Sequence, residues 1–274
     1  MALASVAAAV AVAGERRPRP MAPFTYWLVR YRRGWRASIG PSVVGPALYV
    51  LVFGKLVGRY VPDTAATAAR LGGVDYTAFV APGVVAAAAM LVATSEAGFP
   101  VLTAITRERT YLGMLHAPLT VADLVAGHLL WIVARLVVVS VALVGLLLAV
   151  GAGRSPWVAG AVPAAVLCGL AFAGPLMAYT ARQEDESGLL AWMRFGATPM
   201  LLFGGVFYAT DQLPTAVRLA TRVTPLWHGT ELCRSLSLGT ATPAGSAGHV
   251  AYLGALAGGG AWLAARSIRR RVVG

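Results

Sequence analysis

Among the charged side chains that interrupt otherwise apolar stretches of the sequence, Glu96, Arg135 and Arg194 could act together, because a charge there is costly unless it is paired or hydrated. Glu96 lies near the end of one apolar block, Arg135 lies about eleven residues into a second, and Arg194 about five residues into a third. At ~1.5 Å per helical residue, the two arginines would lie ~16 and ~8 Å deep. We expect Glu96 to pair with one of these arginines and to line the inner entrance of a pathway. The alternative is that each arginine reaches up to lipid phosphates.

No other group of residues has the types and spacing of a catalytic, metal or nucleotide site. The sequence contains no Gly-rich loop ending in Gly-Lys-Ser/Thr, so it cannot hold nucleotide phosphates as a P-loop does. The four histidines lack metal-ligand spacing. Glu184, Asp185 and Glu186 are consecutive and would diverge on a helix, and Ser246 lacks the strand–turn–helix context of a nucleophile. The sequence therefore predicts no metal ion, no cofactor and no catalytic residue in this chain.

The composition indicates an integral membrane protein. Of the 274 residues, 58% are hydrophobic and 12% are charged, whereas a soluble domain has roughly 45–50% and about 25%. A helix needs ~20 residues to cross the hydrocarbon core, and no apolar block alternates as a barrel strand would. We therefore predict an all-α, polytopic bundle with many Ala and Gly contacts between helices. Its six transmembrane helices are expected at about 41–58, 78–100, 124–150, 157–179, 189–209 and 249–265.

Basic residues set the predicted orientation. The formal net charge is +12, and in a membrane protein such charge marks cytoplasmic loops and lipid headgroups, so it does not indicate nucleic acid binding. With both termini cytoplasmic, fourteen arginines fall in inner segments and six in outer ones. We predict a disordered tail over residues 1–23, in which Met21 is an alternative start to Met1, and a single transmembrane domain over 24–274.

Residues 24–39 are predicted to form a helix that lies in the membrane interface. Aromatic and apolar side chains gather on one face of a helical wheel, opposite a face of arginines, and this segregation is typical of interfacial helices. The next two residues, Gly40-Pro41, should end this helix. An ordinary basic flank is the alternative. The apolar face comprises Phe24, Trp27, Leu28, Tyr31, Trp35 and Ile39, and the basic face comprises Arg30, Arg32, Arg33 and Arg36.

A connection of about 20 residues, 103–123, joins the second and third blocks on the predicted inner side. It should contain a short helix that ends near His116, followed by Pro118 and by an N-cap at Thr120. Because a plain connector needs only a few residues, this length suits docking of a soluble partner. A solvated loop without a partner is the alternative.

The outer segment 210–238 is amphipathic and aromatic. Asp211 could cap a short helix with Pro214 in its first turn, Pro225 should end that helix, and a second helix should run from about Trp227 to Leu238. Each helix is too short to span the membrane. We therefore expect a hairpin that dips into the outer leaflet, where protein or water must satisfy its backbone.

These segments together resemble the membrane subunits of type-2 ATP-binding-cassette (ABC) exporters, in particular lipo-oligosaccharide nodulation-factor exporters and actinobacterial drug-resistance permeases. The resemblance covers about residues 24–266, and His128 stands where glutamate is commoner in the family. It rests on Tyr76-x-x-Phe79-Val80-Ala81-Pro82-Gly83 with Met90 and Glu96; on Pro118-Leu119-Thr120 with Asp123, Gly127 and Trp131; on Thr198-Pro199 with Leu201-Leu202-Phe203; on Asp211-Gln212-Leu213-Pro214; and on Thr224-Pro225-Leu226-Trp227-His228-Gly229 with Glu231-Leu232-Cys233-Arg234.

The resemblance implies a permease in the bacterial cytoplasmic membrane, paired with a second permease copy and driven by two separate ABC subunits that bind ATP and magnesium. It implies that 103–117 is a coupling helix that contacts the ATPase, with Arg107, Glu108 and Arg109 as polar contacts and Tyr111, Met114 and Leu115 in a groove of the partner. It further implies that 24–39 is the interfacial helix and that 210–238 is an external re-entrant pair, with Asp211, Pro214, Pro225, Trp227, His228 and Glu231 as its marker residues.

The substrates implied by the resemblance are amphiphiles, from glycolipids and lipo-oligosaccharides to hydrophobic drugs, and the sequence does not choose among them. An ATP-independent channel or secondary transporter is the main alternative. Either would require ionisable rings or broken helices at mid-membrane, and the few charged candidates lie toward the inner side. An integral-membrane enzyme is the third class, and the sequence offers it no site.

Overall fold

The structure is a computed structural model that describes residues 19–61, 64 and 71–272, except for the side chains at 36–41. Its regular secondary structure, within these residues, is helical throughout, which confirms the predicted all-α class. The helices are α2 (Met21–Ile39), η1 (Gly40–Val44), α3 (Gly45–Tyr49), η2 (Val50–Leu56), η3 (Val57–Arg59), α5 (Tyr76–Ala97), α6 (Phe99–Thr106), α7 (Thr110–Leu115), α8 (Val121–Ala149), η4 (Pro156–Gly160), α9 (Ala161–Thr180), α10 (Ser187–Trp192), η5 (Met193–Ala197), α11 (Thr198–Phe203), η6 (Thr210–Gln212), α12 (Thr215–Arg222), α13 (Pro225–Leu238) and α14 (Pro243–Val272).

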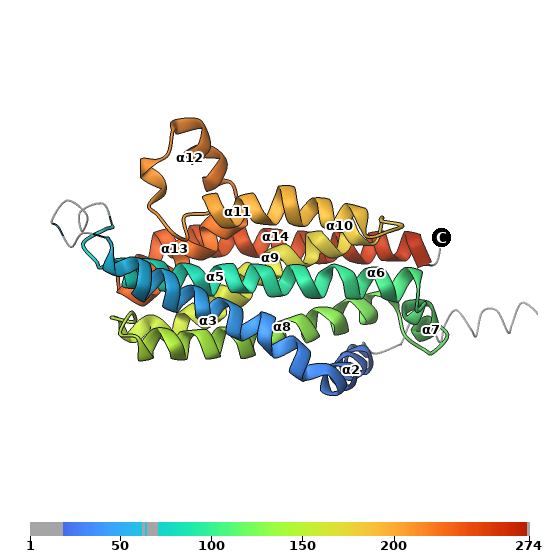
Figure 1. The fold of residues 1–274 in the computed structure, drawn as a ribbon. Helices are drawn as coiled ribbons and strands as arrows, with labels where there is room; N and C mark the ends of the chain where they lie inside the picture. Colours follow the sequence, from blue (N-terminus) through green and yellow to red (C-terminus); the bar gives the residue numbers. More distant parts are fainter. Residues whose placement is uncertain (1–18, 62–63, 65–70, 273–274) are drawn as a thin grey trace, which may run out of the picture.

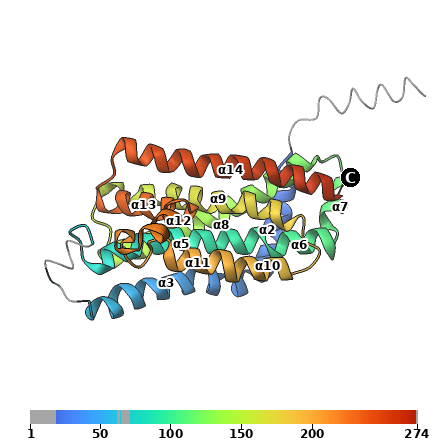
Figure 2. The same ribbon diagram turned by 90° about the horizontal axis from the view of Figure 1, so that it is seen from above.

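Four helical stretches are long and apolar enough to cross a membrane: Ser42–Arg59, Tyr76–Thr106, Val121–Ala149 and Pro156–Thr180. They coincide with the first four predicted spans. The predicted fifth span corresponds to the helical run α10–η5–α11, and the sixth lies within the 30-residue α14. Both run alongside the other long helices in the bundle (Figures 1 and 2), and their crossing of the membrane stays a prediction.

The core depends on small residues where helices meet. A methyl group built on Gly174 of α9 would lie 2.6 Å from the backbone carbonyl carbon of Gly260 on α14, so only glycine allows these two backbones to touch. On α5, the run from Ala86 to Met90 is buried on all sides between other helices. Close packing of small side chains gives dispersion contacts and is the usual way in which helices associate in lipid.

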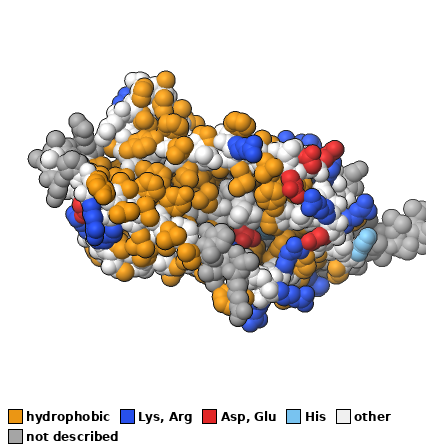
Figure 3. All heavy atoms as spheres, in the orientation of Figure 1, with side chains coloured by type: hydrophobic (Ala, Val, Ile, Leu, Met, Phe, Trp, Pro, Cys, Tyr) orange, Lys and Arg blue, Asp and Glu red, His pale blue; other side chains and the backbone are white. Residues whose placement is uncertain are grey.

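The two ends of the bundle differ in charge and in the elements that they carry. One end, which we call the inner end, holds α2, α6, α7 and the C-terminal end of α14, and most of the charged side chains visible in Figure 3 gather there. At the other, outer end lie α12, α13 and the start of α5, where Asp75 caps the helix by accepting a hydrogen bond from the Ala78 amide at 2.8 Å. On the face shown in Figure 3, the described side chains between the two ends are mainly apolar, as expected of a surface that faces lipid or another apolar helix.

Two local predictions hold and two are wrong. Thr120 caps α8, with Asp123 completing a reciprocal capping box, and α7 ends one residue before His116. The predicted break at Gly40-Pro41 is misplaced: α2 is kinked at Gly34, whose φ of −125° and ψ of 15° are not helical. The chain stays helical through Gly40-Pro41, where the π-helical turn η1 accommodates the proline. Asp211 does not cap α12, whose N-cap position is Pro214. Instead the Asp211 carboxylate accepts a hydrogen bond at 3.2 Å from Arg222, in the last turn of that helix.

Candidate functional site

A buried ion pair lies toward the inner end of the bundle. Arg135 Nε on α8 is 3.1 Å from Glu96 Oε1 on α5, and the two side chains are only 7% and 15% exposed. The other Glu96 oxygen accepts a hydrogen bond at 2.9 Å from the indole N–H of Trp131. A pair so shielded from water needs these additional hydrogen bonds to offset its desolvation.

Two further elements complete the surroundings of Arg135. Its Nη2 donates a hydrogen bond of 2.7 Å to Ser42 Oγ on η1, and its guanidinium carbon lies 4.4 Å from the ring centre of Tyr31 on α2. Such a cation–π contact is worth ~0.5–2 kcal/mol, more where water is excluded. Arg135 thus ties together α2, η1, α5 and α8. Arg194, the other arginine that we predicted as a possible ion-pair partner of Glu96, is exposed on η5.

One turn before Trp131 on α8, His128 links this ion pair to α7. Its Nε2 is 3.2 Å from the main-chain oxygen of Glu96, and its Nδ1 is 2.6 Å from the hydroxyl of Tyr111. Because a carbonyl oxygen can only accept, Nε2 carries the proton, and the Tyr111 hydroxyl donates to Nδ1. Tyr111 and His128 are fully buried. We call Glu96, Tyr111, His128, Trp131 and Arg135 the inner cluster.

The segment 103–117 contains the end of α6 and the whole of α7, joined by a sharp turn. Arg109 adopts the left-handed conformation, with φ of 49°, which is uncommon outside glycine and reverses the chain between α6 and α7. Arg107 and Arg109 are exposed, and Arg107 reaches Glu186 of the 181–188 loop at 2.8 Å. Met114 and Leu115 are half-buried.

Tyr111 is placed differently from our prediction. We expected its ring in a groove of a partner, but it is fully buried inside this chain and bonded to His128. The face of α7 on the opposite side of the helix is formed by Gly113, and a methyl group built there meets nothing within 4 Å. Leu112, which the sequence did not single out, is 40% exposed. A partner of α7 would therefore contact the side that carries Gly113.

Helix α2 lies across the inner end at a steep angle to the long helices (Figures 1 and 2), and its aromatic face is turned to protein. Trp27 is 4% exposed and its ring centre lies 4.2 Å from that of His128. Tyr31 is half-buried, 5.2 Å from Trp131. The prediction that this face meets lipid is therefore wrong for Trp27 and Tyr31, although Trp35 is 45% exposed. Arg32 and Arg33 are exposed as predicted, and the Arg36 side chain lies outside the described residues.

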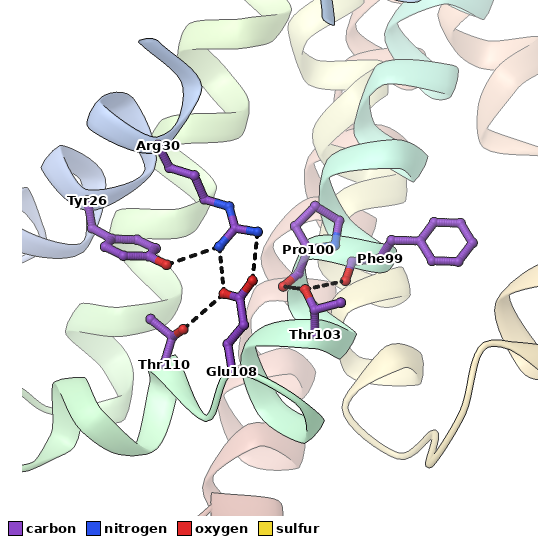
Figure 4. Close-up of polar contacts among 7 residues, drawn as sticks. All are labelled: Tyr26, Arg30, Phe99, Pro100, Thr103, Glu108 and Thr110. Atoms are coloured by element: carbon purple, nitrogen blue, oxygen red, sulfur yellow. Dashed lines mark hydrogen bonds and ion pairs between the residues drawn. The ribbon is translucent and has the colours of Figure 1, made fainter. Parts of the chain in front are cut away.

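An ion pair joins α2 to the segment 103–117 (Figure 4). Arg30 donates two hydrogen bonds to the carboxylate of Glu108, at 2.5 and 2.9 Å, and a third to the hydroxyl of Tyr26 at 3.2 Å. Thr110 also donates to Glu108, at 3.2 Å. Hydrogen bonding and charge from Arg30 lower the pKa of Glu108 below its ordinary value. Sequence reasoning placed Glu108 at a partner surface and did not foresee its pairing with Arg30.

Acidification below about pH 4 is expected to loosen α2 from this segment. Since the folded-state pKa of Glu108 is lowered, the pair contributes stability above the ordinary glutamate pKa of ~4.3, and the contribution is lost as pH falls through the lowered value. The side chains are 44% and 38% exposed, so the effect is small, ~0.5–1 kcal/mol. Hydrogen exchange of the α2 amides, corrected for intrinsic pH dependence, should report it. Glu108→Gln should remove the pH dependence; an unchanged profile would contradict the assignment.

The predicted outer segment holds a second buried arginine. Arg234 of α13 is 7% exposed and donates to the main-chain oxygens of Phe79 at 3.1 Å and Gly205 at 2.6 Å, with Glu231 as its ion partner. It lies 3.8 Å from the ring centre of Phe79. These contacts fix α13 onto the start of α5 and onto the loop after α11. The motif residues around Arg234 were noted from sequence, but its anchoring contacts were not.

Beside this anchor, α13 also contacts the start of α14. His228 Nδ1 lies 2.8 Å from His249 Nδ1, and Tyr252 stacks on His228 with ring centres 4.0 Å apart. Trp227 packs edge-on against both histidines. Pro225 opens α13, and Pro214 is exposed ahead of α12. In the described part of the chain, no three His, Cys, Asp or Glu side chains are close enough to hold a metal ion.

Comparisons with known proteins agree on one family. The family profile described as "ABC-2 type transporter" matches residues 25–238. Nodulation protein J of Rhizobium meliloti (strain 1021) is 31% identical over 224 residues, which cover 78% of this chain and 82% of that protein. Nodulation protein J of Rhizobium leguminosarum bv. viciae is 32% identical over 223 residues, with 78% and 82% covered. Inner membrane transport permease YadH of Escherichia coli (strain K12) is 28% identical over 204 residues, with 73% and 71% covered. No solved structure matches the chain significantly.

Proposed function

The chain belongs to the ABC-2 type transporter family, and from this premise we propose that it is the membrane-spanning subunit of an ATP-driven exporter in the bacterial cytoplasmic membrane. Its substrate is an amphiphile, such as a glycolipid, a lipo-oligosaccharide or a hydrophobic drug. This substrate class is supported by the motif resemblance to lipo-oligosaccharide exporters and drug-resistance permeases. Both termini are cytoplasmic, and the inner end of the bundle faces the cytoplasm, because its basic side chains favour that side.

ATP binding and hydrolysis belong to a separate ABC subunit. The sequence of this chain has no P-loop, and a translocation cycle driven by ATP needs one. ATP and magnesium therefore bind on the partner, and none of the residues described above takes part in that chemistry. Two permeases, most simply two copies of this chain, assemble with two ATPases and enclose the pathway between them.

One observation carries the proposal: α7 faces outward on its Gly113 side and is hydrogen-bonded on its Tyr111 side to the inner cluster. A partner that displaces α7 pulls on His128, and through it on the main chain of Glu96 and on the Glu96–Arg135 pair. Movement outside the membrane thereby reaches charged residues within it. Channels and secondary transporters need no such external lever. Transport by this chain without an ATPase subunit would favour them instead.

The chain alone is expected neither to bind nor to hydrolyse ATP, and to copurify with an ABC ATPase subunit when the two are expressed together. An ATPase encoded by a neighbouring gene is the partner to test first. ATP hydrolysis is measured on the isolated permease, on the isolated ATPase and on the complex in vesicles, with and without candidate amphiphiles. Stimulation by an amphiphile only in the complex supports the proposal, whereas ATP turnover by the isolated permease would overturn it. Accumulation or susceptibility assays on a deletion strain then identify the substrate.

A further inference from the structure

A groove of about 920 Å³ opens at the inner end, between α7, the start of α8 and the C-terminal end of α14. This volume is at the upper end of the ~300–1,000 Å³ typical of small-molecule sites. Its walls are mostly apolar: Leu112, Leu115, Leu119, Val121, Ala122 and Ala265. None of the five residues of the inner cluster lines this groove, so the groove is separate from the site described above.

One face of α14 contributes two arginines and a tryptophan to the groove, and the arginines form its polar rim. Arg266 and Arg269 line it together with Trp262, and all three are exposed. The guanidinium carbon of Arg266 lies 5.4 Å from the Trp262 ring centre, a cation–π contact that restrains this arginine. No carboxylate lines the groove within the described residues, whereas the neighbouring hollow that contains Arg109 and Arg271 includes Glu184. The groove thus presents uncompensated positive charge beside an apolar surface.

We propose that this groove binds an anionic phospholipid of the inner leaflet. The lipid phosphate lies between Arg266 and Arg269, and an acyl chain follows the apolar wall past Trp262 toward the middle of the bundle. Charge complementarity favours an anionic headgroup over a zwitterionic one, because basic pockets between helices on the cytoplasmic side bind anionic headgroups. Trp262 indicates that this part of the groove lies at the level of the lipid headgroups, because exposed tryptophans on membrane helices are enriched there.

A protein occupant fits the groove less well. The groove is bounded by α14, whose apolar face continues from Trp262 and Leu263 toward the middle of the bundle. A lipid enters such a groove sideways from the bilayer, whereas a soluble partner would have to displace lipid from Trp262. The exposed Gly113 face of α7, which we assign to the ATPase, points away from Tyr111, and Gly113 is not among the groove residues.

The test compares two pairs of arginines on one helix end. Arg266→Gln with Arg269→Gln removes the rim charges. Arg270→Gln with Arg271→Gln removes the same net charge from exposed positions outside the groove. Full-length permease is purified in detergent and titrated with phosphatidylglycerol or with phosphatidylcholine of the same acyl chains, and bound lipid is counted by native mass spectrometry. We expect wild-type protein to prefer phosphatidylglycerol by about tenfold. The 266/269 variant should lose that preference and the 270/271 variant should keep it.

A second variant separates the groove from general electrostatics. Ala122→Trp fills the apolar wall at an exposed position and leaves both arginines in place, so it too should lower phosphatidylglycerol binding. Excess inorganic phosphate should not displace the lipid, because it lacks the acyl chain. Equal loss in the two arginine pairs, or unchanged binding in Ala122→Trp, overturns the proposal. So does a 266/269 variant that keeps phosphatidylglycerol but loses its ATPase subunit, since the groove would then be a protein contact.

Discussion

Replacing Gly113 by Trp is expected to abolish amphiphile-stimulated ATP hydrolysis and to reduce copurification of the ATPase subunit by at least about tenfold. Gly113 lies on the exposed side of α7, and a side chain built there meets nothing within 4 Å of its Cβ in this chain. An indole at this position therefore leaves the permease intact. It holds the partner away from the helix, because a docked surface fits too closely to admit a side chain of that size.

Gly248→Trp is the matched control. Gly248 lies near the start of α14, at the opposite end of the bundle, and a side chain there also meets nothing within 4 Å. The two variants differ in place and not in chemistry, so both should insert and unfold like the parent protein. If Gly113→Trp retains a fully coupled ATPase, α7 does not dock on its exposed side.

Tyr111 is unsuitable for this docking test, although the sequence predicts its ring in a partner's groove. In the structure Tyr111 is fully buried against His128, and a carboxylate there would be an unpaired buried charge that destabilises the permease itself. Loss of activity in Tyr111→Asp would thus say nothing about docking. Tyr111→Phe removes only the hydroxyl and reports on the link to His128.

Much of the fold could be predicted because its signals are local. The four spans from Ser42 to Thr180 follow from runs of apolar residues that need no knowledge of neighbours. The start of α8 follows from Thr120 and Asp123, which satisfy each other's backbone amides within one turn. Pro225 was predicted to end the preceding helix, with the next helix starting at about Trp227; α13 starts two residues earlier, at Pro225 itself, whose fixed φ suits a first turn.

What could not be predicted is which surface an amphipathic face meets. The stripe that contains Trp27 and Tyr31 has the same spacing whether it rests on lipid or on α8, and the hydrophobic pattern cannot distinguish these environments. Tyr111 was assigned to a partner for the same reason. The long-range pair of Arg30 and Glu108, 78 positions apart, has no local signature. Glu96 and Arg135 could be singled out because a charge within an apolar block needs a partner. Arg194 met the same criterion, and only the packing of the helices shows that Arg135 is the partner.

The buried pair itself provides the last prediction. Glu96→Gln leaves the Arg135 guanidinium without a counter-charge, and Arg135→Gln does the same to the Glu96 carboxylate, because their other partners, Ser42 and Trp131, are neutral. Removing one partner of a buried pair typically costs ~3–5 kcal/mol. Each single variant is therefore expected to be markedly less stable and to lose most of its transport. Thermal unfolding in detergent and substrate transport in vesicles are measured separately, so that lost protein is not counted as lost function.

The double variant should recover part of both losses, because two glutamines can bond to each other and no charge remains unpaired. We expect a coupling free energy within ~0.5–3 kcal/mol, the range for residues in contact. Arg194→Gln is the control, since that arginine is exposed on η5 and its removal should leave stability nearly unchanged. If stability recovers in the double variant but transport does not, the charges themselves act in the pathway. Strictly additive losses would mean that Glu96 and Arg135 act independently, and the pairing would then have no role in either property.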